Sequence, residues 1–247
     1  MSAVRELLAR YLRQRRELGE DTLFLEALAR GEAVALASGR LPQRRAAAAT
    51  AAPPQPESAP AAASPELERV RAEALACTRC RLHEGRHSVV FGEGAADAKV
   101  VVVGEAPGAE EDRTGRPFVG PAGRLLDRLL LSVGFPREQV YICNVLKCRP
   151  PGNRDPQPDE IASCAPFLER QIELIAPRVL LAVGSFAAQT LLGEAHSIGT
   201  LRGRVHRRRG VPLVATYHPA YLLRSPERLR TAWQDFQLLR QVVDGEA

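Results

Sequence analysis

The sequence predicts an α/β domain in which a parallel sheet is covered by helices on both faces. Four short runs are too apolar for half-exposed strands, and they lie at residues 100–103, 140–145, 179–183 and 211–216. Segments with helical spacing of apolar residues separate these runs, so strands and helices alternate along the chain. At 247 residues the chain is long enough for one such domain and an appendage.

The first 64 residues differ in composition from the rest of the chain. Apolar residues recur at helical spacing in residues 2–19, and 21–37 is a second helical candidate, so we expect a helical extension over residues 1–37. Residues 38–64 are rich in Ala, Pro, Arg and Gln and are expected to form a linker. The extension is either a small solvated helical hairpin or a site for an unidentified protein partner. The main domain is expected over residues 65–247.

The first half of the main domain places its most unusual loop directly after a strand. A helix over residues 66–76 is expected to lead into a Cys-Thr-Arg-Cys turn at 77–80. Four consecutive valines then form the strand at 100–103, and the loop behind it is rich in glycines and carboxylates. Pro121 is expected to start an amphipathic helix, because Pro is favoured in a first turn. In open α/β sheets ligands bind beyond the carboxyl ends of strands, which is where this loop lies.

The second half continues the alternation. The strand at 140–145 ends in a stretch too rich in Pro and Gly to be regular, and Asp159 is expected to cap the helix behind it, which ends near Ile175. The third strand is followed by a helix that ends near Gly193. After the fourth strand, residues 225–226 (Ser-Pro) are expected to open the last helix.

Three of the four strands deliver a polar group just past their carboxyl ends. Glu105 follows the first strand, Asn144 ends the second, and His218 follows the fourth. Taken singly, an Asn at a strand end is typical of a turn and a His before Pro is typical of a loop. The carboxyl ends of parallel strands share one edge of a sheet, so we expect the three residues to converge on one cleft.

The five cysteines divide by their spacing. Cys77 and Cys80 form a two-ligand turn, and Cys148 and Cys164 are separated by fifteen residues. In a reducing compartment this pattern favours a metal site over disulfides. Four thiolates can hold a zinc ion or an iron–sulfur cluster, and the spacing does not decide between them. Cys143 lies inside an apolar strand, where a free thiol behaves as a small hydrophobe.

Charge and hydropathy bound the partners. The net charge of +5 permits a polyanionic partner without requiring one. The chain has no long uncharged apolar run, and charges are interspersed through its leading segment. We therefore expect neither a membrane span nor a secretory signal, and a cytoplasmic, monomeric protein.

Several long motifs carry a resemblance to a known family. They are GEAPGAEEDRTGRPFVGPAGRLLD, NVLKCRPPGNRDPQPDEIASC, LRGRVH and TYHPAYLLR. Together they resemble the family 4 uracil-DNA glycosylases over about residues 65–243. This family is the bacterial and archaeal iron–sulfur class within the uracil-DNA glycosylase superfamily. The resemblance implies a three-layer α/β/α fold with a central four-stranded sheet and excision of uracil from DNA in base excision repair. It also implies a 4Fe–4S cluster, with the ligands Cys77, Cys80, Cys148 and Cys164.

The resemblance and the chemistry of uracil together give roles to the site residues. Phe118 is expected to stack on a uracil that has been flipped out of the helix. Asn144 can donate to uracil O4 and accept from N3–H, whereas cytosine presents the opposite groups at these positions. Glu111 is expected to crowd C5 and reject the methyl group of thymine. Gly104 and His218 complete the expected substrate pocket.

The catalytic and DNA-contacting residues follow from where charge develops. His218 is placed to donate a hydrogen bond to uracil O2 as the base leaves. Glu105 is expected either to stabilise the sugar cation or to orient water, because Ala106 stands where other families of the superfamily place a water-activating Asp. Expected phosphate contacts are Lys147, Arg149 and Arg224, and residues 221–224 are expected to wedge into the duplex.

Two other classes of protein fit parts of this pattern. A module that captures uracil-DNA without turnover exists in the same superfamily, but it is expected to carry a basic, His-bearing insertion after the second strand, where this chain has RPPGNRDPQPD. An electron-transfer protein also holds a cluster, but ferredoxins space their cysteines more tightly than the interval from Cys80 to Cys148. Neither class explains the polar edge of Glu105, Asn144 and His218.

Overall fold

The computed structural model describes residues 64–246. By its internal contacts the chain divides into units at residues 1–55 and 56–247. The predicted helical extension over residues 1–37 lies outside the described residues, as does the predicted linker up to residue 63. Ser64 is the N-cap of helix α3 (Pro65–Leu75), where its Oγ accepts a hydrogen bond from the backbone N–H of Leu67 at 3.2 Å.

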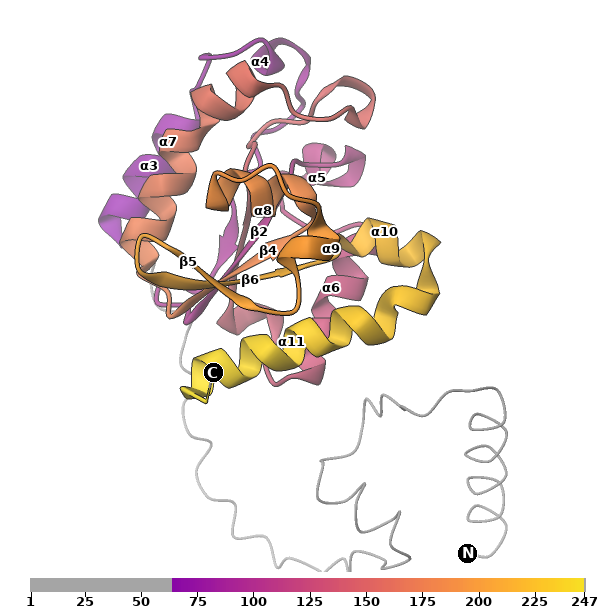
Figure 1. The fold of residues 1–247 in the computed structure, drawn as a ribbon. Helices are drawn as coiled ribbons and strands as arrows, with labels where there is room; N and C mark the ends of the chain where they lie inside the picture. The colour runs from indigo at the N-terminus through magenta and orange to yellow at the C-terminus, as the bar shows by residue number, and fades with distance from the viewer. Residues whose placement is uncertain (1–63, 247) are drawn as a thin grey trace, which may run out of the picture. The chain divides into compact units, whose positions relative to one another are not determined.

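The centre of the molecule is a six-stranded sheet with the strand order β1-β3-β2-β4-β6-β5 (Figure 1). Its four inner strands are parallel to one another and correspond to the four predicted apolar runs. They are β3 (Tyr141–Asn144), β2 (Val100–Gly104), β4 (Val179–Val183) and β6 (Val211–Thr216). Nearly every residue in these strands is buried, because helices cover both faces. The predicted α/β fold with a central four-stranded parallel sheet is therefore confirmed.

Two short antiparallel strands extend the sheet at its edges. β1 (Glu93–Gly94) pairs with β3, and β5 (Val205–Arg208) pairs with β6. Neither strand was predicted from the sequence. The two residues of β1 are too few to show a periodicity, and β5 (Val-His-Arg-Arg) has only one apolar residue. Both are edge strands, and charged side chains such as the arginines of β5 discourage pairing with other chains.

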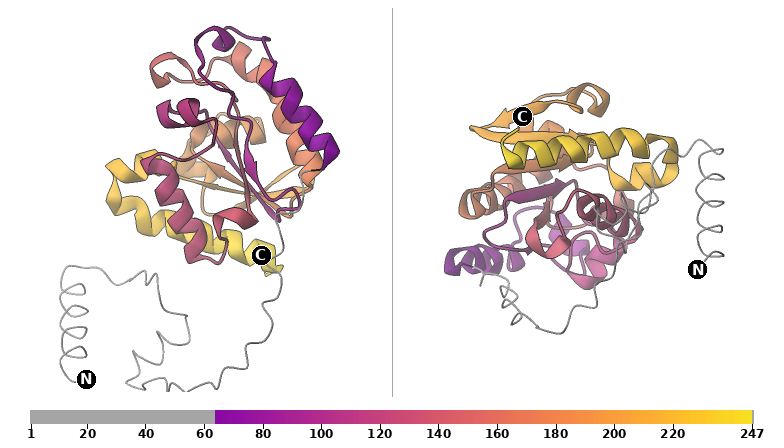
Figure 2. Two further views of the ribbon diagram at one scale, coloured as in Figure 1. Left: turned by 180° about the vertical axis from the view of Figure 1, so that it is seen from behind. Right: turned by 90° about the horizontal axis from the view of Figure 1, so that it is seen from below.

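Helices cover the two faces in separate groups, which gives the three layers seen in Figure 2. Residues of α3, α7 (Pro158–Ile175) and α8 (Ser185–Leu192) pack on one face, in a core that includes Val101 and Val103. Residues of α6 (Pro121–Ser132) and α11 (Leu229–Asp244) pack on the other, in a core that includes Val100 and Val102. The alternation follows from strand geometry, because successive side chains point to opposite faces.

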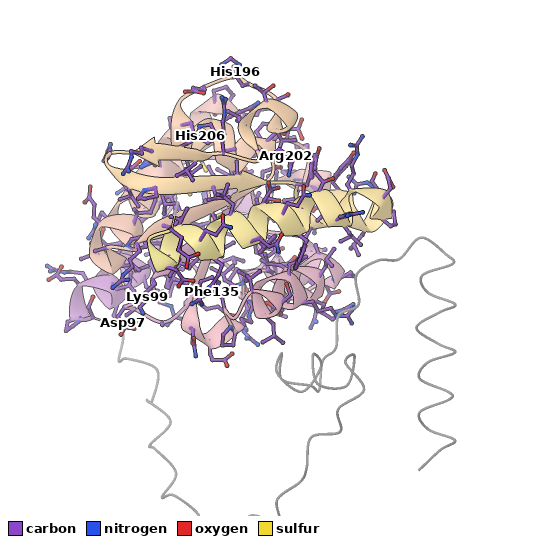
Figure 3. All side chains as sticks on the ribbon, turned by 60° about the horizontal axis from the view of Figure 1, so that its bottom comes forward. Asp97, Lys99, Phe135, His196, Arg202 and His206 are labelled. Carbon is purple, nitrogen blue, oxygen red and sulfur yellow. The ribbon has the colours of Figure 1, made fainter. Side chains whose placement is uncertain are left out.

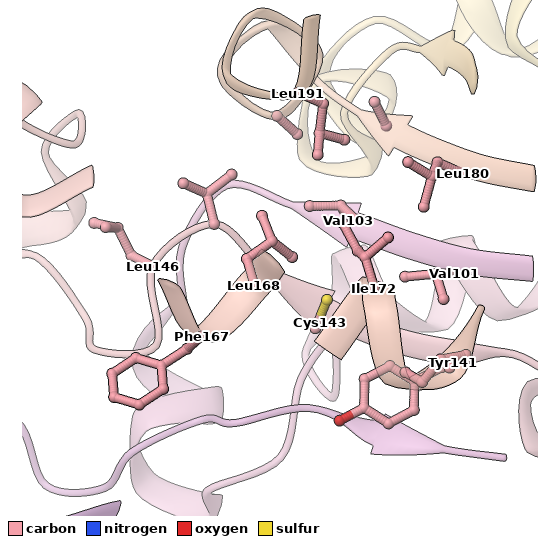
Figure 4. Packing of buried hydrophobic residues seen from close by; sticks show 14 of the residues in the cluster. Val101, Val103, Tyr141, Cys143, Leu146, Phe167, Leu168, Ile172, Leu180 and Leu191 are labelled. Atoms are coloured by element: carbon pink, nitrogen blue, oxygen red, sulfur yellow. The ribbon is translucent and has the colours of Figure 1, made fainter. Parts of the chain in front are cut away.

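Cys143 belongs to the first of these cores. It lies in the middle of β3 among Val101, Val103 and Ile172, and it is fully buried (Figure 4). Burial also raises the pKa of its thiol, with the charge of Lys147 opposing the shift. The prediction that this cysteine serves as a small hydrophobe agrees with its position.

The remaining helices are short and were not predicted from the sequence; two of them border the site described below. These are α5 (Ala109–Thr114), inside the expected loop, and α10 (Pro219–Arg224), which begins directly after His218. Both are single turns or little more, so their apolar periodicity is too brief to recognise. The others are α4 (Leu82–Gly85), α9 (Ile198–Leu201) and the 3₁₀ turns η1 (Arg137–Gln139), η2 (Pro151–Asn153) and η3 (Pro226–Arg228).

One predicted cap is wrong. Helix α7 is capped by Gln157 and not by Asp159, because Gln157 and Glu160 form a reciprocal capping box in which each side chain faces the other's backbone N–H. The last predicted helix also begins later: residues 226–228 form η3, and α11 starts at Leu229. Within residues 64–246, no helix combines the length and the apolar character that crossing a bilayer requires.

Candidate active site

Strand register brings the predicted polar residues to one edge of the sheet. Gly104 of β2 is paired with Asn144 of β3, and Val183 of β4 with Thr216 of β6, so the carboxyl ends of the four strands are level. A cavity of about 430 Å³ opens at this edge and has the size of a small-molecule site. Its lining includes Glu105, Glu111, Phe118, Asn144, His218 and Arg224. The predicted convergence of Glu105, Asn144 and His218 on one cleft is confirmed.

Asn144 lines this cavity and carries a buried polar atom that has no partner within residues 64–246. The residue is 1 % exposed, and its Oδ1 has no hydrogen-bond partner among the described residues. A buried oxygen without a donor costs about 1–3 kcal/mol, so such atoms are rare unless a ligand completes them. The atom lies close to the end of β2, since a Cβ at Gly104 would stand 2.4 Å from it. A hydrogen-bond donor brought by a ligand would satisfy this oxygen.

The imidazole of His218 is held in one tautomer. The backbone N–H of Ala220, in the first turn of α10, donates to His218 Nδ1 at 3.1 Å. Burial lowers the pKa of His218 to about 4, with the positive charge of Arg224 acting in the same direction and Glu111 opposing it. The ring is thus neutral at pH 7, and because Nδ1 accepts, its proton is on Nε2. The ring centroid lies 5.9 Å from that of Phe118.

His218 has to pass the end of β4 to reach the cavity, because β4 lies between β2 and β6. Gly184, which follows β4, makes this possible. A Cβ at Gly184 would stand 3.1 Å from the Cβ of His218 and 3.2 Å from its Cδ2. β4 itself brings no polar side chain to the cavity, but the glycine at its end leaves room for His218, which follows the neighbouring strand β6.

The carboxyl group of Glu105 is a weaker acid than an exposed glutamate. Burial raises its pKa to about 7, and the negative charge of Asp155 adds to the effect. Its backbone carbonyl accepts from Leu146 N at 2.9 Å, which joins the end of β2 to the segment after β3. At neutral pH the group is divided between its charged and neutral forms, as is typical of carboxyls that take part in catalysis.

The loop of Phe118 is fixed from two sides. Glu111 Oε1 accepts from the backbone N–H groups of Val119 and Gly120, at 2.9 and 3.0 Å. Arg137 Nη1 donates to the carbonyl of Phe118 at 3.2 Å. Phe118 itself has a φ of 49°, a left-handed conformation that is uncommon for a large residue and typical of strained functional loops. The aromatic ring is thus held at the cavity by its surroundings.

A second cavity collects the four cysteines that were predicted as ligands. Cys77 and Cys80 come from the turn after α3, Cys148 follows β3, and Cys164 lies on α7; all four line this cavity. Two of the sulfurs already accept hydrogen bonds, Cys148 from Arg86 Nη1 at 3.2 Å and Cys164 from the backbone N–H of Lys147 at 3.3 Å.

The thiols around this cavity do not converge on a point. In the part of the chain that the structure describes, no three Cys, His, Asp or Glu side chains are grouped so as to hold one metal ion. Burial raises the pKa of Cys164 to about 11, against the charge of Lys147. It also raises that of Cys148, against Arg86. Binding of an inorganic group there would therefore release thiol protons.

Comparison with known proteins decides the family. The model of the Uracil DNA glycosylase superfamily matches residues 91–237. The chain belongs to the uracil-DNA glycosylase superfamily. Among curated relatives, the Type-4 uracil-DNA glycosylase of Thermotoga maritima is 47 % identical, over 73 % of this chain and 96 % of the relative. That of Archaeoglobus fulgidus is 42 % identical, over 71 % and 92 %. A Type-5 uracil-DNA glycosylase of Pyrobaculum aerophilum is 33 % identical, over 61 % and 71 %.

The predicted contact between Lys147 and DNA phosphate is wrong. Lys147 is 1 % exposed, and its ammonium donates to the carbonyl of Asn144 and to Gln171 Oε1, so it cannot reach a phosphate. Arg224 is exposed and lines the cavity. Arg149 is not among the lining residues, but its Nε donates to Oδ1 of Asn153, which does line the cavity, at 2.7 Å. Gly104 does not line the cavity but lies behind it.

The structure adds residues from the Pro- and Gly-rich loop after β3. Asn153 and Arg154 line the cavity, and Arg154 Nη1 donates at 2.9 Å to Glu160, a carboxylate with no exposed surface. Asn153 has a φ of 53°, again a left-handed conformation. Neither Asn153 nor Arg154 was predicted from the sequence as a site residue. The loop's signal was the placement of polar residues beside Cys148, directly after a strand that ends in Asn144.

Proposed function

We propose that the protein is a uracil-DNA glycosylase, which flips uracil out of DNA and hydrolyses the bond between base and sugar. The product is an abasic site, the first intermediate in repair of deaminated cytosine. The observation that carries this proposal is the buried, unpartnered Oδ1 of Asn144 in a cavity that also presents Phe118 and a neutral His218. The names of the relatives above support the same activity.

The state of Asn144 accounts for the choice of base. A uracil that enters the cavity brings an N3–H donor for Oδ1 and an O4 acceptor for the amide N–H. Cytosine has no hydrogen on N3, so Oδ1 would stay unpartnered at a cost of about 1–3 kcal/mol. Phe118 offers its ring for stacking. Glu111 is held in place by two backbone N–H groups and would reject a methyl group at C5.

His218 and Glu105 supply the chemistry. When the bond between the sugar C1′ and uracil N1 breaks, its electron pair leaves with the base, so uracil O2 becomes negative and the sugar positive. The Nε2–H of a neutral His218 donates to O2, and this hydrogen bond strengthens as the charge develops. Water adds to C1′ and loses a proton, which neutralises the departing uracil anion directly or through solvent. Glu105 either orients that water or stabilises the sugar cation with its charge.

Helix α10 is the proposed element for entering the duplex. In residues 221–224, Leu222 is buried in the core, and the ring of Tyr221 packs 5.3 Å from that of Tyr217. Leu223 is 48 % exposed, and Arg224 beside it faces solvent and lines the cavity. An apolar wedge next to a phosphate-binding cation is the arrangement that stabilises DNA with a base removed from the stack.

The four cysteines that line the second cavity are the proposed ligands of the 4Fe–4S cluster that the family resemblance implies. Four thiolates are the usual donor set of such a cluster, and all four of these cysteines line the same cavity. Cys77, Cys80, Cys148 and Cys164 would hold the cluster, and Arg86 would donate to one of its thiolates. The chemistry that it supplies is a covalent cross-link between the turn after α3, the loop after β3 and α7.

The proposal is tested with oligonucleotides that carry uracil, thymine or cytosine at one position, scored for abasic sites by alkaline cleavage. We expect the full-length protein to act on uracil only. Asn144→Ala should lose most activity and keep its fold, and Asn144→Asp should begin to accept cytosine, because a protonated carboxyl can pair with its edge. Specific binding without abasic product would instead identify a capture protein. A wild-type rate in Asn144→Ala would remove Asn144 from the site.

DNA that contains uracil is the partner that this proposal requires. The monomeric state, the cytoplasmic location and a partner for residues 1–37 remain predictions from the sequence.

A further inference from the structure

Lys147 is a buried cation that the proposed chemistry does not use. Only two of the 34 basic residues of the chain are lysines, Lys147 and Lys99. The ammonium of Lys147 donates to the carbonyl of Asn144 at 2.7 Å and to Gln171 Oε1 at 2.5 Å, and lies 5.9 Å from the centre of the Phe91 ring. No carboxylate of residues 64–246 forms an ion pair with it. A buried charge without an anion is costly, so this one needs an explanation.

The position of Lys147 between the two cavities explains why a charge is buried there. It lines the cysteine cavity, its backbone N–H donates to Cys164 Sγ, and the next residue is Cys148. Its ammonium also holds the backbone carbonyl of Asn144, the residue that lines the active-site cavity and carries the unpartnered Oδ1. Four thiolates around an inorganic core would supply the anion that the ammonium lacks.

The segment that joins the cavities is short and clamped. Between Asn144 and Cys148 there are only three residues, and two of them bind the end of β2: Val145 N donates to Gly104 O, and Leu146 N to Glu105 O, both at 2.9 Å. A displacement of Cys148 would therefore also move Asn144, which is four residues away in the chain, and Glu105, which is hydrogen-bonded to Leu146. The ammonium closes this segment into a ring, because residue 147 binds the carbonyl of residue 144.

Helix α7 fixes the ammonium from the other side. Gln171 lies seven residues after Cys164, which places both on one face of the helix. Its Nε2 donates to Phe91 O at 2.9 Å and Tyr141 Oη at 3.0 Å, so the amide orientation is set and its Oε1 points at Lys147. An arginine could not replace the lysine, because its planar fork is larger than the compact ammonium that these two carbonyls enclose.

We propose that Lys147 is a positioning residue that couples the cysteine cavity to base recognition, by holding Asn144 in place while it faces the anionic group on the cysteines. The inference rests on the proposed function, since it assigns a support to the residue that reads uracil. It predicts that loss of the ammonium disturbs the discrimination between uracil and other bases more than it disturbs binding to DNA in general. It also predicts the same disturbance when Gln171 no longer holds the ammonium.

The test compares Lys147→Met with the wild-type protein on three readouts. They are iron content, affinity for DNA with 2′-fluoro-deoxyuridine, whose fluorine suppresses cleavage, and affinity for the same DNA with thymidine. Lys147→Met should retain iron and thymidine-DNA binding while its preference for the uracil probe falls roughly 10- to 100-fold, the range for a lost hydrogen bond to a charged group. Gln171→Met should reduce the preference in the same direction.

Two variants serve as controls. Lys99 is exposed and directly precedes β2 (Figure 3), whereas the cavity lies beyond the carboxyl end of that strand, so Lys99→Met removes the other lysine without touching the bonds of Lys147. Tyr141→Phe removes a partner of Gln171 but leaves the ammonium bonds in place, so it reports general loosening of this buried network. Both should keep the wild-type preference.

The outcomes separate the inference from the proposed function. Wild-type protein that excises no uracil would refute the function. Wild-type activity together with an unchanged preference in both Lys147→Met and Gln171→Met would overturn the role of Lys147. An equal loss in Tyr141→Phe would also overturn it, since the effect would then belong to the network as a whole. If Lys147→Met does not fold, Gln171→Met decides.

Discussion

The reactive residues differ in how firmly their surroundings set their state. His218 is neutral and in one tautomer because its ring is buried beside Arg224 and because Ala220 N donates to its Nδ1. The pKa of Glu105 is raised to about 7 because the carboxyl group is buried and lies near the negative charge of Asp155. One group is therefore constant over the range of pH in which the other changes. Their contributions to the rate can be separated by pH alone.

Removal of the imidazole should affect the chemical step. We expect His218→Ala to lower the single-turnover rate on the order of 10²- to 10³-fold, the range for a lost donor to a developing negative charge. Binding to uracil-DNA should change little, because the hydrogen bond strengthens mainly in the transition state. Rapid-quench kinetics and filter binding measure the two effects. Weaker binding with an intact single-turnover rate would make His218 a positioning residue and contradict the mechanism.

Glu105 should govern the pH dependence of the rate. If its charged form is active, the single-turnover rate rises as the pH increases through about 7, the pKa to which burial raises it. Asp155→Asn should move this midpoint to lower pH, because it removes a neighbouring negative charge. Glu105→Gln should abolish the dependence. It should cost less than His218→Ala if Glu105 orients water, and as much or more if its charge stabilises the sugar cation.

The same shift in pKa predicts an effect on stability. The folded protein binds the Glu105 proton more tightly than the unfolded chain, so its free energy of unfolding falls as the pH rises from about 4.5 to about 7. Glu105→Gln lacks this penalty. Its Tm should therefore exceed that of the wild type at pH 8 and match it at pH 4, as measured by calorimetry. A lower Tm at pH 8 would show that the charged carboxylate stabilises the fold.

Among the elements, α6 and the Phe118 loop depend on one close approach. A Cβ at Gly123, in the first turns of α6, would lie 1.8 Å from the carbonyl oxygen of Phe118. Two backbone segments cannot both stay in place at that distance. The strained conformation of Phe118 thus requires both the hydrogen bonds of Glu111 and Arg137 to the loop and a helix that leaves space for the loop.

Helix propensity and packing predict opposite results for Gly123→Ala. Propensity alone predicts stabilisation by about 1 kcal/mol, whereas the clash predicts destabilisation by about 1–3 kcal/mol, as for other overpacked sites. We expect the clash to dominate, with a lower Tm and slower excision of uracil as Phe118 moves. Gly199→Ala on α9 is the matched control, because its Cβ would meet only Ser197 Oγ at 3.7 Å. Equal Tm changes in the two variants would contradict the argument.

In the molecule as a whole, the cysteine cavity connects parts of the chain that are far apart in sequence. We expect Cys148→Ala and Cys164→Ala each to lose the brown colour, the bound iron and much of the folding stability, because the cross-link is lost. Cys143→Ala, in the core, should keep iron. Visible absorption, iron analysis and thermal unfolding measure these effects. Stoichiometric zinc without iron in anaerobically prepared protein would refute the cluster assignment.

The chain order of residues was enough to predict the inner sheet, the two-sided helical cover and the edge at which Glu105, Asn144 and His218 meet. This succeeded because the four apolar runs and the polar residues at their ends are local features of the sequence, and parallel strands always bring their carboxyl ends to one edge. The short elements β1, α5 and α10 were missed, since two to six residues are too few for a periodicity. The Cys-x2-Cys turn indicated a metal site, but its spacing left the kind of metal open.

The opposite fates of Lys147 and Arg224 show what the sequence alone determined and what needed the tertiary structure. Both are basic residues near strand ends, and both were expected to bind phosphate. The sequence determines that each carries a positive charge and lies near the site. Only the fold decides that one faces solvent and that the other is enclosed by Asn144 and Gln171. The physical reason is that burial and hydrogen bonding depend on residues that are distant in the chain, and a pattern along the sequence contains no information about those partners.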